Sequence, residues 1–120
     1  MMESKIRNFR DLKVWQLGMD IVEDVYAITK NFPKEEIYGL TAQMRRSAVS
    51  MPSNVAEGFT RRHNKENVQF LYIALGSSAE LETQIEISIR LDYLSKAASD
   101  AVLEKINHWC RMTMNLLKKL

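Results

Sequence analysis

Apolar side chains recur at intervals of three and four residues along almost the whole chain, and few residues interrupt this pattern. The chain has only four glycines and two prolines among its 120 residues. Residues spaced by three and four share one face of an α-helix, because the helix has 3.6 residues per turn. The pattern therefore predicts an all-α fold of long helices joined by short turns.

Turn and capping residues divide the pattern into four predicted helices. Pro33 ends the first, because proline disfavours the helical conformation of the residue before it. Gly58 fits the end of the second, Asn64 can cap the third and Ser99 the fourth. The predicted helices span residues 9–31, 36–58, 64–93 and 99–119. Packed as one domain over residues 1–120, they predict an up-down-up-down antiparallel four-helix bundle.

The first predicted helix carries two apolar stripes. One contains Leu12, Trp15, Met19, Val22, Tyr26 and Thr29, and the other contains Val14, Leu17, Ile21, Val25, Ile28 and Phe32. One stripe is enough for the core of a monomer, so a wider apolar arc has a second surface to bury. We therefore expect self-association and assign Val14, Ile21, Val25 and Ile28 to an interface between copies. The alternative is a helix whose whole apolar arc lies in the core of one chain.

Two residues that disfavour helices lie inside predicted helices. Pro52 leaves the carbonyl of Ala48 without its helical partner, which predicts a kink. Gly76 costs about 1 kcal/mol relative to alanine in a helix, so a neighbour should pack closely against it. Trp15 or Tyr72, from another helix or another subunit, are the candidates.

Side chains that could support catalysis or bind a metal are few and poorly spaced. The lone Cys110 excludes a disulfide framework, and the serines near Pro52 have no base beside them. His63 and His108 do not follow the Glu-x-x-His spacing of a di-metal bundle. We predict no catalytic residue, no metal and no cofactor, and therefore no enzyme. The N-terminal segment shows neither a secretory signal nor a membrane span, so we expect a cytoplasmic protein.

Charged residues occur in blocks, although the formal net charge is only +2. One block holds basic residues of the second predicted helix, and another makes the third predicted helix acidic. Arginine suits bidentate pairing with carboxylates, so we predict structural ion pairs within or between subunits. The residues assigned to these pairs are Arg45, Arg46, Glu57, Glu80 and Glu82.

A second basic group lies in the turn between the second and third predicted helices. Arg61, Arg62 and Lys65 are the predicted nucleic-acid-binding residues, because an exposed basic turn can contact phosphates. Near the N-terminus, Lys5, Arg7, Arg10 and Lys13 would extend this turn into a basic rim.

Two long motifs carry a resemblance to a known family. The first runs from Phe32-Pro33 through Glu36, Tyr38-Gly39-Leu40, Gln43, Arg46, Ser50, Pro52 and Asn54 to Ala56-Glu57-Gly58, and the second contains Gly76-Ser77, Glu80 and Glu82-Thr83. In these motifs the chain resembles the bacterial 23S rRNA intervening-sequence proteins, which include the accessory variability determinant of diversity-generating retroelements. The resemblance runs from about Phe9 to Leu120. Ser47 and Met51 depart from the alanine and isoleucine that are common in the family.

The resemblance implies a four-helix bundle that assembles as a homopentameric ring. Retroelement members bind nucleic acid and associate with a reverse transcriptase, whereas many other members have no established activity. The modest charge of +2 favours the intervening-sequence branch. Two functions follow as hypotheses. The first is a homo-oligomeric protein that binds structured RNA, another nucleic acid or a ribonucleoprotein through its basic rim, and the second is a self-assembling interaction scaffold without nucleic acid.

Overall fold

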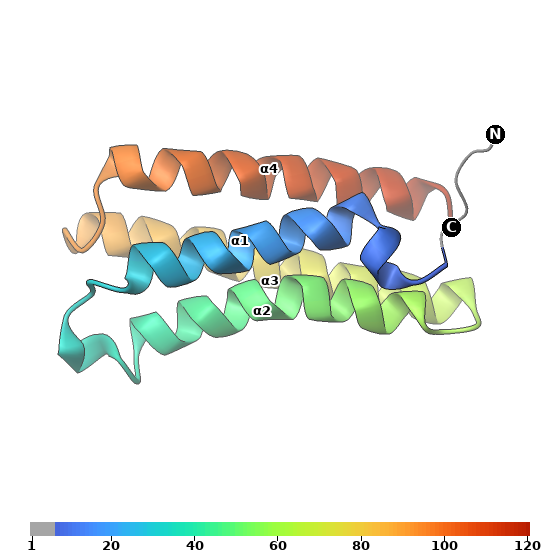
Figure 1. The fold of residues 1–120 in the computed structure, drawn as a ribbon, viewed down its shortest axis with the longest axis horizontal. Helices are drawn as coiled ribbons and strands as arrows, with labels where there is room; N and C mark the ends of the chain where they lie inside the picture. The colour runs from blue at the N-terminus through green and yellow to red at the C-terminus, as the bar shows by residue number, and fades with distance from the viewer. Residues whose placement is uncertain (1–6) are drawn as a thin grey trace.

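Four long helices form the protein, and the computed structural model describes residues 7–120 of the chain. They are α1 (Lys13–Thr29), α2 (Leu40–Phe59), α3 (Asn64–Arg90) and α4 (Lys96–Lys118), with short 3-10 helices at η1 (Phe9–Asp11) and η2 (Lys34–Glu36). Successive long helices run in opposite directions, and the described residues form no strand (Figure 1). The predicted all-α up-down-up-down bundle is confirmed.

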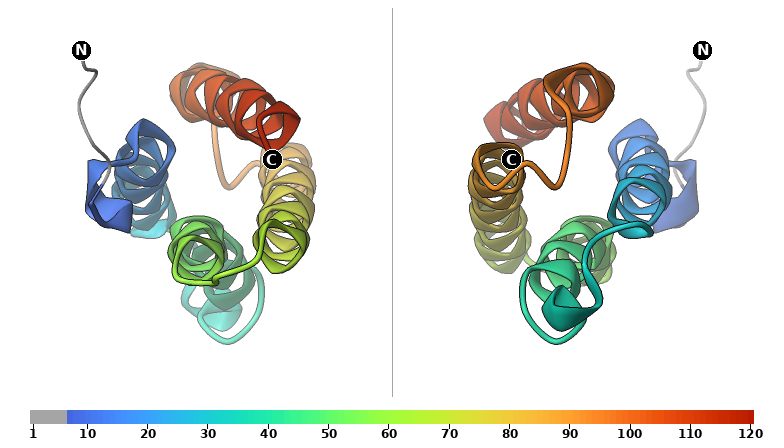
Figure 2. Two further views of the ribbon diagram at one scale, coloured as in Figure 1. Left: turned by 90° about the vertical axis from the view of Figure 1, so that its right-hand side faces the viewer. Right: turned by 90° about the vertical axis from the view of Figure 1, so that its left-hand side faces the viewer.

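The helices surround one elongated core. Viewed end-on, α1 lies beside α2 and α4, and α3 lies beside the same two helices on the opposite side (Figure 2). The bundle measures 47 × 25 × 20 Å. Its largest fully buried side chains include Trp109 from α4, Met44 and Met51 from α2, and Leu81 and Ile85 from α3.

The two apolar stripes of α1 face different surroundings, and this corrects one prediction. Val14, Ile21 and Val25 are buried in the core of the chain itself, and Ile28 packs against that core half-buried. Val14, Ile21 and Val25 are therefore not available to an interface between copies. The other stripe is the more exposed one, and we call it the outward stripe: Met19 and Tyr26 are 39% and 45% exposed, although Thr29 at its end is buried.

Local hydrogen bonds move several helix ends away from their predicted positions. Near residue 9 the backbone forms η1 first, because Asn8 and Asp11 cap it reciprocally, and α1 begins only at Lys13. At the start of α4, Ser95 rather than Ser99 is the cap, since its hydroxyl accepts from the N–H of Ala98 at 3.1 Å. Ser99 is buried inside the first turn.

Glu36 connects the segment before α2 to the far end of α3. One carboxylate oxygen accepts from the N–H of Leu40 at 3.0 Å, at the start of α2, where Gly39 offers no side-chain cap. The other accepts from the Tyr93 hydroxyl at 2.9 Å. This hydrogen bond raises the pKa of the Tyr93 phenol above its ordinary value. A second polar contact between helices joins α4 to α1, where the ammonium group of Lys105 donates to the carboxylate of Asp24 at 2.8 Å.

Gly18 and Pro52 allow α1 and α2 to approach closely. A Cβ atom at Gly18 would lie 3.2 Å from the Pro52 ring and 3.4 Å from the Trp109 indole nitrogen. The ring is buried against α1, so the proline that interrupts the hydrogen bonding of α2 also contributes to the packing of the core.

Candidate nucleic-acid interface

Antiparallel packing gathers basic side chains at one end of the bundle. The start of α1, the α2–α3 turn and the end of α4 meet there (Figure 1). Residues 7–13, 57–66 and 118–120 contain eight Lys and Arg residues against three Asp and Glu, whereas residues 30–36 and 90–100 at the opposite end contain four of each. We call the first group the basic end. Its members are Arg7, Arg10, Lys13, Arg61, Arg62, Lys65, Lys118 and Lys119.

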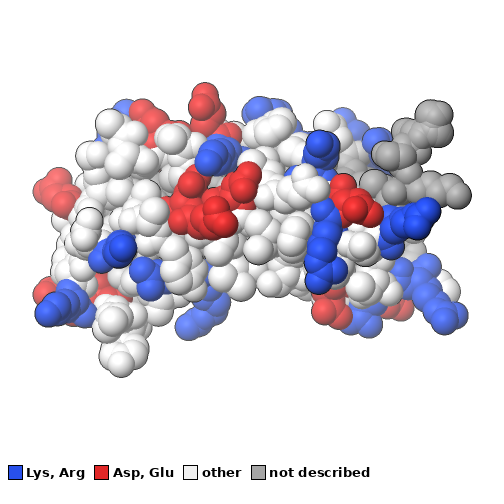
Figure 3. Space-filling view, viewed as in Figure 1, with Lys and Arg blue, Asp and Glu red and all other residues white. Residues whose placement is uncertain are grey.

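The surface shows the same separation of charge. Lys and Arg side chains gather where α1 begins and α2 ends, and an acidic cluster lies over the middle of the bundle (Figure 3). Lys5 was also predicted to belong to the rim, and it lies outside the described residues. The net charge of +2 is thus an average over a basic end and a more acidic remainder.

The three predicted nucleic-acid-binding residues are all exposed, but they differ in their partners. Arg61 contacts the carboxylate of Glu57 at 2.6 Å and lies 4.9 Å from the centre of the Phe70 ring. Within residues 7–120, no carboxylate lies in salt-bridge range of Arg62 or Lys65. Arg62 and Lys65 therefore offer more uncompensated charge than Arg61.

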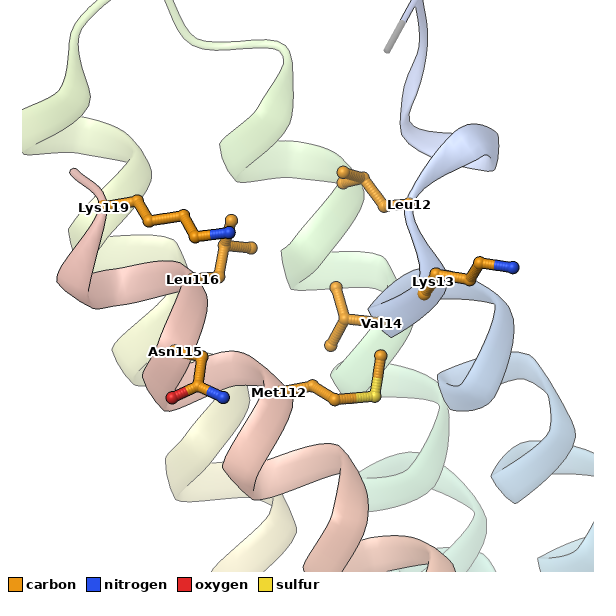
Figure 4. Close-up of a pocket in the computed structure, with 7 residues that line it drawn as sticks. All are labelled: Leu12, Lys13, Val14, Met112, Asn115, Leu116 and Lys119. Carbon is orange, nitrogen blue, oxygen red and sulfur yellow. The ribbon is translucent and has the colours of Figure 1, made fainter. Parts of the chain in front are cut away.

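A groove of about 300 Å³ opens between α1 and α4 at the basic end. Leu12, Val14, Met112 and Leu116 contribute apolar atoms to it. In Figure 4, Lys119 extends over Leu116 toward the groove, whereas Lys13 points away from α4. Among the described residues, the groove is lined by two lysines and by no acidic side chain, which favours an anion at its rim over a cation.

The structural ion pairs predicted for α2 and α3 do not form within the described chain. Arg45 donates to the Thr29 hydroxyl at 3.0 Å and lies 4.4 Å from the centre of the Tyr26 ring. Arg46 and Glu80 are exposed and Glu82 is half-buried, and none of the three has an ion-pair partner among residues 7–120. Glu57 does form an ion pair, but with Arg61. The prediction of pairs between these arginines and glutamates within one chain is therefore wrong.

Potential metal ligands do not gather anywhere in residues 7–120. No group of three His, Cys, Asp or Glu side chains could hold a metal ion there. Burial raises the pKa of the Cys110 thiol, whose sulfur lies 3.3 Å from the Ser78 hydroxyl. A protonated thiol is a poor nucleophile at neutral pH. None of the helices in residues 7–120 combines the length and the hydrophobicity that a membrane span requires.

Comparison with known proteins identifies the family. The model of the 23S rRNA-intervening sequence protein family matches residues 10–115. The chain belongs to this family. A protein of unknown function from the S23 ribosomal protein family of Bacteroides thetaiotaomicron has a similar structure, with a TM-score of 0.78 at 18% sequence identity over 88% of this chain and 98% of that one. No curated protein matches the chain.

The matched residues 10–115 contain α1, α2, α3 and most of α4, so this bundle is the fold of a member of the intervening-sequence protein family. Neither the description of the family nor that of the similar structure names an enzymatic activity. Evidence about the function of this family member must therefore come from the surface of the bundle.

Sequence reasoning missed two features of this surface. Both stripes of α1 are apolar in the sequence, and the stripe that contains Ile21 was predicted to form the interface. In the structure, the stripe that contains Met19 is the more exposed of the two. Ile37 and Tyr38, before α2, are 55% and 94% exposed. The only signal of their exposure in the sequence is that they follow Pro33, which ends the preceding helix. The sequence does not show that the hydrogen bonds of Glu36 hold this segment in place.

Proposed function

We propose that the protein is a non-enzymatic, homo-oligomeric helical bundle of the cytoplasm that binds RNA through phosphate contacts at its basic end. The excess of basic side chains at one end carries this proposal. Phosphate contacts require Lys and Arg side chains that are exposed and not already paired, and Arg62 and Lys65 meet both conditions among the described residues.

The aromatic side chains near the basic end favour backbone contacts over base stacking. Arg10 covers Phe9 at 4.6 Å, and Arg61 covers Phe70 at 4.9 Å, each measured to the ring centre. Phe9 also packs against Trp15. Since guanidinium groups and neighbouring rings occupy these faces, bases have few platforms on which to stack. We therefore expect little sequence preference.

Assembly would strengthen a weak contact. A single basic end offers few phosphate contacts, but a homo-oligomer repeats it once per subunit and raises the effective concentration of each further contact. The pentameric ring implied by the family resemblance is the assembly we propose. Large apolar side chains left exposed on α1 and α3, such as Met19, Tyr72 and Ile73, support self-association.

A charge-matched pair of triple variants tests the proposal. Arg61, Arg62 and Lys65 are replaced by alanine in one variant, and Lys30, Lys34 and Lys96 at the opposite end in the other. Both remove three positive charges, so a general effect of net charge would weaken RNA binding equally. We expect gel shifts with a structured RNA at low salt to show weaker binding in the first variant only. Equal affinities in the two variants would reject the basic end as the binding surface.

The alternative is an interaction scaffold that binds no nucleic acid. The Glu57–Arg61 ion pair favours it, because this pair already neutralises one of the three basic residues of the turn. An intact oligomer without measurable RNA affinity at low salt would support the scaffold.

A further inference from the structure

The outward stripe of α1 and the facing side of α2 form an apolar groove. The groove has a volume of about 320 Å³. We call it the α1–α2 groove, and its apolar lining comprises Trp15, Met19, Val22, Val49, Pro52 and Ala56. Met19 and Val49 are 39% and 41% exposed, so one chain alone leaves much of this apolar lining in contact with water.

A different apolar surface lies on the outer side of α3. Tyr72 and Ile73 are 57% and 52% exposed beside Gly76. No atom of another part of residues 7–120 lies within 4 Å of where a Cβ of Gly76 would be. Glycine is less favourable than alanine inside a helix, and no contact among the described residues explains the glycine at this position. We call Tyr72, Ile73, Gly76 and Ala79 the α3 saddle.

The groove and the saddle lie at the same height along the bundle. The hydroxyls of Ser50 on α2 and Ser77 on α3 are 2.7 Å apart. This contact places Val49 of the groove level with Gly76 of the saddle. Copies arranged around an axis parallel to the bundle would therefore bring the groove of one copy to the saddle of the next.

Opposite charges border the two surfaces. Arg46 precedes Val49 on α2 by about one helical turn, and Glu80 follows Gly76 on α3 by about one turn, so both lie toward the same end of the bundle. Both side chains are exposed and lack an ion-pair partner among residues 7–120. The arrangement that would join groove to saddle would also bring Arg46 near Glu80 of the neighbouring copy.

We propose that a second copy of the chain docks its α3 saddle against the α1–α2 groove, with Arg46 facing Glu80 of that copy. This inference rests on the proposed homo-oligomer and specifies its contact. Groove and saddle are different surfaces, so the contact is heterologous, and each added copy again exposes one groove and one saddle. Heterologous contacts of this kind generate a closed ring when a whole number of copies completes one full turn about the axis.

Charge reversal tests the contact by sedimentation. R46E and E80R each place like charges across the proposed contact, so we expect each variant to raise the dissociation constant of the assembly at least tenfold. In an equimolar mixture, every contact between an R46E copy and an E80R copy restores opposite charges, so we expect the mixture to recover molar mass toward the wild-type value. R111E, on the exposed surface of α4, is the control and should assemble normally.

A steric variant tests the saddle independently. G76W fills it, and the open space around Gly76 leaves room for the side chain within one copy. We expect a folded but dissociated protein, whereas R111W should remain assembled. Normal assembly of R46E, E80R or G76W, or no recovery in the mixture, would overturn the proposed contact while leaving the homo-oligomer intact. A wild-type monomer at micromolar concentration would reject the homo-oligomer itself and this contact with it.

Discussion

Ile21 and Met19 lie two positions apart on α1 and face opposite surroundings. Ile21 has no exposed surface, whereas Met19 is 39% exposed. Two residues correspond to about 200° around a helix, so one side chain enters the core while the other points outward. Replacing Ile21 should therefore affect the fold of the bundle rather than a contact between copies.

We expect Ile21→Ala to lower the free energy of unfolding by about 2–5 kcal/mol, because it leaves a cavity among close-packed side chains. Met114→Ala, at a side chain of α4 that is 46% exposed and belongs to neither the α1–α2 groove nor the α3 saddle, is the control and should cost clearly less. Urea denaturation at one fixed protein concentration measures both. Similar decreases for the two variants would contradict the burial of Ile21 in the core of the bundle.

Cys110 gives a second prediction at this scale. Burial raises the pKa of its thiol, so little thiolate is present at neutral pH. We expect iodoacetamide to modify Cys110 at pH 8 much more slowly in the folded protein than in the protein unfolded in urea. Mass spectrometry follows the reaction, and equal rates in the two states would show that the thiol is accessible and ionises normally.

The sequence predicts which residues of α1 share a stripe, but not which stripe the rest of the bundle covers. Ile21 and Val25 were grouped correctly, and their assignment to an interface failed because both stripes are similarly apolar. Only the positions of α2, α3 and α4 distinguish them. Likewise, the charge of Glu80 was evident from the sequence, whereas the absence of an ion-pair partner among the described residues depends on how α2 and α3 are rotated.

At the scale of the elements, Glu36 fixes the start of α2 and the turn after α3 together. Tyr93 donates to its carboxylate across 57 positions of sequence, at 2.9 Å. No local pattern predicts such a long-range contact. The same applies to the helix ends, where the Asn8–Asp11 caps and Ser95 moved the boundaries that periodicity placed at residues 9 and 99.

We expect Tyr93→Phe to lower the urea midpoint of unfolding at pH 7, because the variant lacks the hydrogen bond to Glu36. The bond raises the pKa of the Tyr93 phenol above its unfolded value of about 10. A raised pKa means that the stabilisation is fully present below the unfolded pKa and disappears as the pH rises through the folded one. The difference between wild type and variant should therefore shrink above pH 10.

A midpoint difference that stays constant from pH 7 to pH 11 would contradict this account of Tyr93. Tyr38→Phe serves as the control. Tyr38 is 94% exposed and makes no hydrogen bond through its hydroxyl among residues 7–120, so its replacement should change the midpoint little at any of these pH values.

At the scale of the whole molecule, topology turns scattered charges into one basic end. Once an up-down-up-down bundle is predicted, the start of the first helix and the turn between the second and third must meet. The sequence therefore predicts the basic rim, which includes Arg10, Lys13, Arg62 and Lys65. The ion pair that neutralises Arg61 joins positions four apart, a spacing that favours pairing on a helix, but the second helix was predicted to end at residue 58, before Arg61.

The salt dependence of RNA affinity tests the proposed phosphate contacts most directly. Anisotropy titrations of a labelled structured RNA, at several potassium chloride concentrations, compare the wild type with a variant in which Arg62 and Lys65 are alanine. The proposal predicts that the logarithm of the wild-type binding constant falls linearly with the logarithm of salt concentration. It also predicts that the variant binds more weakly, with a slope shallower by about one for each phosphate that the variant no longer neutralises. RNA affinity that does not change with salt, or identical slopes for the two proteins, would contradict the proposal.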